Sequence, residues 1–171
     1  MENNFLTGSE DMIMMRSIAV LLLAFVAGMT SSLAQEADTK AVAEIKGMLE
    51  KHDKAFNEQN LAAVMETFAP GPKTVVLGTG PGERWVGKEE IDAAYKEMFK
   101  DFDPGSMTAT CTWKVGDVMG NLAWLMAMCQ LTDYLKNVKR EYGLNISAVL
   151  EKMDGKWYFR AMHFSNLTGG Q

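Results

Sequence analysis

The sequence contains few of the residues that build metal and nucleophilic sites. It has two cysteines and two histidines among 171 residues. Cys111 and Cys129 do not have the spacing of zinc ligands, and His52 and His163 lie far from them in the chain. No serine stands in a nucleophile-elbow pattern, and neither cysteine has a histidine positioned beside it. We therefore expect no metal ion and no cofactor.

The sequence also lacks a cluster of positive charge. The formal net charge is −5 at pH 7, which is unfavourable for binding nucleic acid. Residues 78–82 contain three glycines but have neither the strand–GxGxxG–helix context nor the Gly-Lys-Ser/Thr ending of a phosphate-binding loop. With 47% hydrophobic and 23% charged residues, the composition is typical of one ordinary globular domain. We expect no nucleic-acid partner.

The longest apolar run lies near the N-terminus and is short. Arg16 precedes the uncharged residues 17–29, too few to cross a bilayer of roughly 30 Å as a helix, and Ser32-Leu33-Ala34 follows. This pattern is typical of a cleaved secretory signal, with a buried or membrane-anchoring helix as the alternative. We expect residues 1–34 to be an N-terminal extension plus signal peptide. The protein would be secreted or periplasmic, without stable membrane insertion after cleavage.

The residues before Arg16 suit a signal peptide poorly because Glu2, Glu10 and Asp11 make them acidic. Translation from Met14 or Met15 would instead give a short segment that ends in a positive charge. We therefore expect the first thirteen residues to be a misassigned start.

After a polar linker at 35–40, residues 41–168 are predicted to form one domain. Apolar residues recur at helical spacing over 42–56, 61–68 and 87–102. His52 falls on the apolar stripe of the first of these helices. It is either a core histidine with one hydrogen bond or a polar group that faces a cavity, because a buried imidazole needs a partner.

The strands follow a different pattern. Residues 74–77 and 83–86 are predicted as short strands, and residues 107–118, 122–134, 142–153 and 156–167 as longer ones. Residues 136–141 are expected to be a charged connection, and Asp154-Gly155 a two-residue hairpin turn. This order of elements predicts an α+β fold. The strand 122–134 is apolar on both faces until Gln130, so it is either covered twice or has one face covered by a partner chain.

Period-two alternation assigns side chains to the faces of the strands. It places Trp157, Phe159 and His163 on one face of the last strand and Arg160 on the other. It also places Cys111 and Trp113 on one face. An odd loop centred on Gly120 would set Cys111 opposite Cys129, whereas a two-residue turn would put them on opposite faces. The pairing of the two cysteines in a disulfide therefore stays open.

Two stretches carry a family resemblance. Trp85-Val86-Gly87-Lys88-Glu89-Glu90-Ile91 resembles the strand–Gly–helix junction of SnoaL-like proteins in the nuclear transport factor 2-like superfamily. Asp154-Gly155-Lys156-Trp157, followed by His163-Phe164-Ser165, resembles their terminal strand and is also similar to the association domain of calcium/calmodulin-dependent kinase II. The resemblance covers residues 41–168. It implies a cone-shaped α+β fold, with a curved, mostly antiparallel sheet and about three helices from the N-terminal half on its concave side.

The same resemblance implies a pocket between helices and sheet, and a homodimer through the outer sheet face. Isomerases and cyclases of this kind need a carboxylate base in an apolar pocket and an acid that hydrogen-bonds an enolate. Asp53, Tyr95, Asp133 and Tyr134 do not reproduce that set. The leading hypothesis is the binding of a small apolar or weakly acidic ligand, with the question of catalysis left open.

Two alternatives remain: an isomerase, cyclase or dehydratase acting next to a carbonyl, and a homo-oligomerisation module, since one scaffold supports many functions. The candidate ligand-pocket residues are His52, Phe56, Tyr95, Trp113, Arg160 and His163.

Overall fold

The computed structural model describes residues 38–167. The chain divides into two compact units, residues 1–41 and 42–171, and the fold described here is that of the second. The expected signal segment, residues 1–34, lies outside the described residues. Residues 38–40 are helical, although the sequence suggested a linker there. Between residues 38 and 167, no helix is long and apolar enough to cross a membrane.

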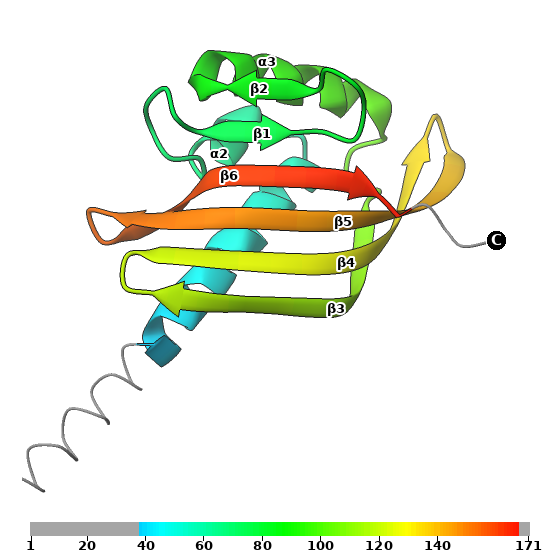
Figure 1. The fold of residues 1–171 in the computed structure, drawn as a ribbon. Coiled ribbons are helices and arrows are strands. Elements are labelled where there is room, and N and C mark those ends of the chain that lie inside the picture. Colours follow the sequence, from blue (N-terminus) through cyan, green and yellow to red (C-terminus); the bar gives the residue numbers. More distant parts are fainter. Residues whose placement is uncertain (1–37, 168–171) are drawn as a thin grey trace, which may run out of the picture. The chain divides into compact units, whose positions relative to one another are not determined.

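One six-stranded sheet organises the domain (Figure 1). In sequence order its strands are β1 (Val75–Leu77), β2 (Arg84–Val86), β3 (Thr108–Met119), β4 (Leu122–Leu135), β5 (Val138–Met153) and β6 (Lys156–Asn166). In space their order is β2-β1-β6-β5-β4-β3. Only the β1–β6 pair is parallel among these neighbours. The expected α+β class with a mostly antiparallel sheet is confirmed.

Helices lie on one side of this sheet (Figure 1). They are residues 42–57 of the first helix, α2 (Leu61–Met65), α3 (Gly87–Met98) and the 3-10 helix η1 (Phe99–Asp101). Asn60 caps α2 by accepting a hydrogen bond from the backbone N–H of Ala63. Gly87 has φ of 79°, a conformation that favours glycine, and it turns β2 directly into α3. We call the sheet face toward these helices the inner face and the opposite one the outer face.

The β4–β5 connection is shorter than expected. Lys136 and Asn137 have φ of 53° and 64°, as in a type I′ turn, and Leu135 pairs with Val138 across them. The prediction of a charged connection over 136–141 is therefore wrong for residues 138–141, which belong to β5. The predicted Asp154-Gly155 turn is confirmed, with Met153 paired to Lys156.

A bulge at Thr112 changes the register of β3. Cys111 pairs with Cys129, but Trp113 pairs with Met128, so Thr112 is an extra residue. The turn at Gly120-Asn121 has two residues, because Met119 pairs with Leu122. Without the bulge, that turn would separate the cysteines onto two faces. With it they face each other and form a disulfide.

The same bulge corrects an assignment made from alternation. Cys111 stays with Cys129, which is buried on the inner face, whereas Trp113 is moved to the outer face beside Met128. The prediction that Cys111 and Trp113 share a face is therefore wrong. One inserted residue reverses the facing of everything that follows.

A second bulge lies at Arg160 in β6. Leu150 pairs with Phe159 and Val149 with Ala161, which leaves Arg160 as the extra residue. Its guanidinium donates to the carbonyl oxygen of Pro70 and to Thr74 Oγ1, both at 3.3 Å.

This second bulge overturns the predicted position of His163. Trp157 and Phe159 are buried on the inner face, but His163 is exposed on the outer face. The prediction that all three share one face is wrong, because the bulge shifts the alternation by one residue.

Candidate functional site

The inner candidates meet around a buried hydrogen bond. His52 Nε2 lies 3.1 Å from the Tyr95 hydroxyl oxygen, and His52 is only 5% exposed. His52 Nδ1 lies 3.4 Å from Asp53 Oδ1, whose side chain is 82% exposed. Burial, and secondarily the negative charge of Asp53, raises the pKa of the Tyr95 phenol. Tyr95 therefore keeps its proton, and its hydroxyl can donate a hydrogen bond to Nε2 of the imidazole.

Aromatic rings surround this pair. The centroid of the His52 ring lies 5.0 Å from that of Phe159 and 5.9 Å from that of Phe68. Phe56 stacks on His52 at 6.2 Å and contacts Phe102 at 5.1 Å. These rings fill the space between the first helix and the inner sheet face. Of the two meanings left open for His52, the structure favours the core histidine with a satisfied hydrogen bond.

The outer candidates lie on a cross-strand row of paired residues. From β2 to β3 this row is Arg84, Leu77, His163, Ser147, Met126 and Val115. Paired residues on neighbouring strands project to the same face, so these side chains share the outer face. The Arg160 bulge brings His163 onto it, and the Thr112 bulge brings Val115 and Trp113.

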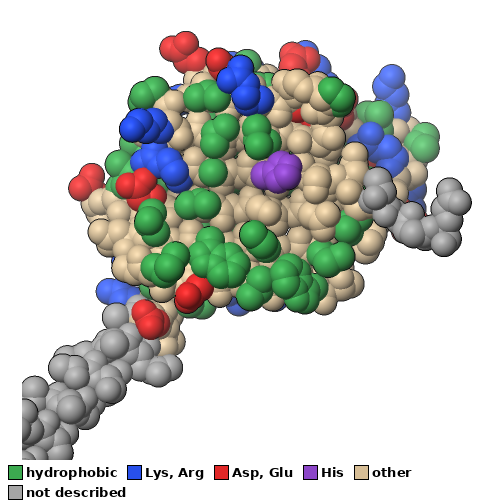
Figure 2. All heavy atoms as spheres, viewed as in Figure 1, with side chains coloured by type: hydrophobic (Ala, Val, Ile, Leu, Met, Phe, Trp, Pro, Cys, Tyr) green, Lys and Arg blue, Asp and Glu red, His purple; other side chains and the backbone are tan. Residues whose placement is uncertain are grey.

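Large apolar side chains are exposed across this face. The exposed apolar residues are Leu77, Trp113, Val115, Met119, Leu122, Met126, Met128 and Val149. We call these eight residues, together with Trp124 and His163 that lie among them, the outer patch. The eight are between 38% and 58% exposed. Figure 2 shows green hydrophobic side chains spread over this face around a histidine.

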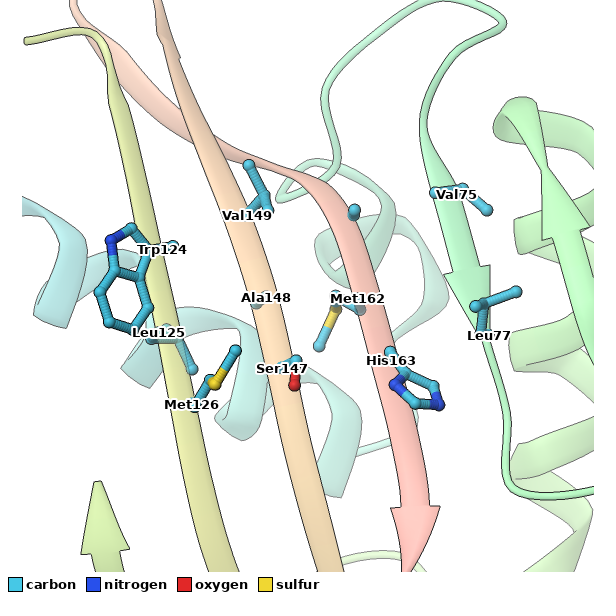
Figure 3. A pocket seen from close by; sticks show the side chains of 11 residues that line it. Val75, Leu77, Trp124, Leu125, Met126, Ser147, Ala148, Val149, Met162 and His163 are labelled. Carbon is cyan, nitrogen blue, oxygen red and sulfur yellow. The ribbon is translucent and has the colours of Figure 1, made fainter. Parts of the chain in front are cut away.

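A hollow of about 220 Å³ lies within the outer patch (Figure 3). His163 and Ser147 are the polar side chains on its wall, and Val149, Trp124 and Met126 are among the apolar ones. A smaller hollow of about 80 Å³ lies by α2 and α3 and is lined by Met65, Phe68 and Lys88 among others. The larger hollow has room for a small molecule, although it is below the usual range of ligand pockets.

Charged side chains border the patch. Arg84 stands at its β2 end, and Asp117 of β3 pairs with Trp124 at the other. Arg160 Nε donates to Glu151 Oε2 at 2.6 Å beside the bulge. Arg160, proposed from the sequence as a ligand contact, is thus held by protein groups.

The structure therefore places the six candidate residues in three separate regions. His52, Phe56 and Tyr95 lie together inside, His163 and Trp113 lie on the outer face, and Arg160 lies at its border. Alternation alone did not single out Met126, Met128 and Val149. The available signal was the strand 122–134, which is apolar on both faces. No part of the chain between residues 38 and 167 covers the outer face of this strand.

The sequence profile of the SnoaL-like domain matches residues 45–169. The chain belongs to the SnoaL-like family. None of the curated proteins compared with it matches.

Several solved structures share the fold. A candidate calcium/calmodulin-dependent protein kinase II association domain from Xanthomonas campestris is 21% identical, with a TM-score of 0.63, 74% of this chain covered and 88% of the other. A ketosteroid isomerase-like protein from Erwinia carotovora atroseptica is 22% identical, with a TM-score of 0.60 and coverage of 74% and 96%. A nuclear transport factor 2-like protein with a cystatin-like fold from Novosphingobium aromaticivorans is 11% identical, with a TM-score of 0.65 and coverage of 84% and 91%. At these identities the likeness establishes the fold alone.

Proposed function

We propose that this SnoaL-like domain is a self-association module in which two copies pair through the outer patch. The observation that carries this proposal is the outer patch of exposed apolar side chains on β1, β3, β4 and β5, which no part of the chain between residues 38 and 167 covers. Monomeric proteins rarely expose contiguous apolar patches larger than a few hundred Å². From the exposed fractions, the eight apolar residues present on the order of 800 Å², about the contribution of each partner to a standard interface.

The charge distribution favours a second copy as the occupant. The central rows of the patch on β4, β5 and β6 around Ser147 and His163 contain no Asp, Glu, Lys or Arg. Asp117 lies between Val115 and Met119 on the edge strand β3, and Glu151 pairs with Leu122 at the far end of β4. A chain with a negative net charge repels its own copy at long range, so a contact surface with few charges suits self-pairing. The similarity to a protein named for association gives modest support.

Substitution within the patch tests this proposal. Sedimentation of the wild-type protein at micromolar concentration should show a dimer, and Met126→Glu should give a monomer, because it places a charge in the apolar contact. Val138→Glu is the matched control, since Val138 is 65% exposed but lies by the β4–β5 turn, outside the patch. The control should remain dimeric. A monomeric wild-type protein would contradict the proposal.

The binding of a small apolar or weakly acidic molecule is the second candidate function. The hollow of about 220 Å³ favours it, because His163 and Ser147 offer hydrogen bonds within apolar walls. Native mass spectrometry of the purified protein reports the oligomer and a co-purified ligand together. A mass equal to that of the polypeptide alone, for both monomer and dimer, would count against ligand binding while leaving self-association intact.

Export is proposed from the signal pattern at residues 1–34 and supported by the disulfide. A Cys111–Cys129 bond persists in oxidising compartments and is rare in the cytosol. N-terminal sequencing of the protein recovered from the cell exterior or periplasm should begin at Gln35. Recovery of an uncleaved chain from the cytosol would contradict export.

A further inference from the structure

We propose that His163 makes self-association depend on pH, so that the pair of chains forms near neutral pH and separates on acidification. This inference rests on the proposed pairing through the outer patch. His163 lies within that surface, with Leu77 on one side and Ser147 on the other. A histidine so placed fits an apolar contact only while its ring is neutral, because burying an unpaired charge is unfavourable.

The strands around His163 offer no counter-ion next to it. On β5 the opposite residue is Ser147, flanked on the same face by Asn145 and Val149. On β1 the neighbours are Leu77 and Val75. Along β6 itself, Ala161 and Ser165 lie two residues away on the same face. None of these side chains can neutralise an imidazolium.

The charges that face His163 lie further away. Arg84 of β2 is in the same row two strands away, roughly 10 Å at the usual strand spacing, and its positive charge would oppose a second one. Glu83, in the β1–β2 loop, is held at 2.8 Å by the backbone N–H of Gly80.

The remaining charges are paired with other groups or lie on a distant strand. Arg160 and Glu151 pair with each other at the bulge, and Asp117 lies across the sheet on β3. At about 10 Å, salt largely screens such interactions. Protonated His163 therefore has water as its main source of stabilisation, and pairing removes that water.

Histidine is the side chain whose ordinary titration falls between about pH 5 and 8. Each pair of chains contains two copies of His163, so separation takes up as many as two protons. By linkage, the logarithm of the dissociation constant then rises with falling pH with a slope that approaches about two. A rise of at least about tenfold between neutral pH and about pH 5.5 is the expected effect.

The test measures dissociation constants of the intact exported protein by sedimentation between about pH 8 and pH 5.5 at fixed ionic strength. The wild-type protein should dissociate on acidification. His163→Gln keeps a polar side chain without titration, and its dissociation constant should change less than about threefold over the same range. His163→Lys carries a permanent charge and should be largely monomeric even at about pH 8. Circular dichroism at each pH checks that the variants stay folded.

Each outcome has one meaning. A wild-type dimer whose dissociation constant does not change with pH overturns the role of His163 but leaves the self-association proposal standing. Equal pH dependence in His163→Gln and wild type does the same. A tight His163→Lys dimer at about pH 8 also overturns it, and this arm needs no acidic sample. A wild-type protein that is monomeric at about pH 8 overturns both proposals.

Discussion

His52 and His163, the two histidines of the chain, lie on opposite sides of the sheet. His52 contacts the inner side of β6 through Phe159, at 5.0 Å between ring centroids, whereas His163 is exposed on the outer side of the same strand. Phe159 and His163 are four positions apart, an even spacing that regular alternation would place on one face. The extra residue Arg160 separates them. The histidines therefore cannot act on one ligand, and their roles can be tested independently.

The inner histidine is expected to contribute to stability through Tyr95. Tyr95→Phe removes the hydroxyl 3.1 Å from His52 Nε2 and leaves a buried nitrogen unpaired. We expect a loss of about 1–2 kcal/mol in the free energy of unfolding, measured in urea. Tyr158→Phe, on the half-buried Tyr158 of β6, is the control and should change it by less than about 0.5 kcal/mol.

A double-mutant cycle identifies the hydrogen bond as the cause. His52→Phe with Tyr95→Phe removes both polar partners, so the double variant should lose less stability than the two single losses combined. Strict additivity would show that the hydroxyl and the imidazole are not coupled.

The sequence predicted the element types well because each has a local signal. Helical spacing indicated the long helices, and Asp154-Gly155 marked its hairpin with a residue suited to positive φ. The β4–β5 turn was missed because Lys136 and Asn137 adopt positive φ without a glycine. Asn tolerates that conformation, but a lysine gives no such signal.

The candidate site was predicted less well because facing depends on bulges. Each bulge is associated with contacts between segments that are distant in the sequence, and the alternation of apolar and polar residues within one strand does not reveal such contacts. Phe159 forms a bridge with Phe68 and Ala161 pairs with Val75 at the start of β1, so Arg160 bulges opposite the loop that connects these two partners. Thr112 bulges so that Cys111 and Cys129 meet despite a two-residue turn. A shift of one residue at each position exchanged the inner and outer side chains of half a strand.

The Cys111–Cys129 disulfide is expected to stabilise the β3–β4 hairpin. It links residues 18 positions apart, for which loop-closure entropy gives about 3 kcal/mol. The double variant Cys111→Ala/Cys129→Ala should lose about that much free energy of unfolding, and reduced wild-type protein should match it. Alkylation before reduction should leave the intact mass unchanged. Two alkylated thiols in freshly exported protein, or equal urea midpoints with and without reductant, would contradict this.

Tyr142 and Asp133 provide the last prediction, at the turn end of β4 and β5. Arg140 donates to both carboxylate oxygens of Asp133, at 2.7 and 2.9 Å, and the Tyr142 hydroxyl donates to Oδ2 at 2.9 Å. Burial, and then the hydrogen bond and charge of Asp133, raises the pKa of Tyr142 to about 12. An unfolded tyrosine ionises near pH 10, so the folded state holds this proton more tightly. The associated stability is fully present below about pH 10 and is lost as the pH rises toward about 12.

Asp133→Asn keeps the shape of this cluster and removes its charge. Tyr142 should then ionise at lower pH, because part of the cause of its raised pKa is gone. The phenolate absorbance of wild type minus that of Tyr142→Phe isolates this titration, and the same subtraction in the D133N background gives the shifted one. Arg140 also loses its counter-ion, so D133N should lose on the order of 2 kcal/mol at neutral pH, less than for a fully buried pair because Arg140 is partly exposed. An unchanged Tyr142 titration in D133N would show that burial alone raises the pKa.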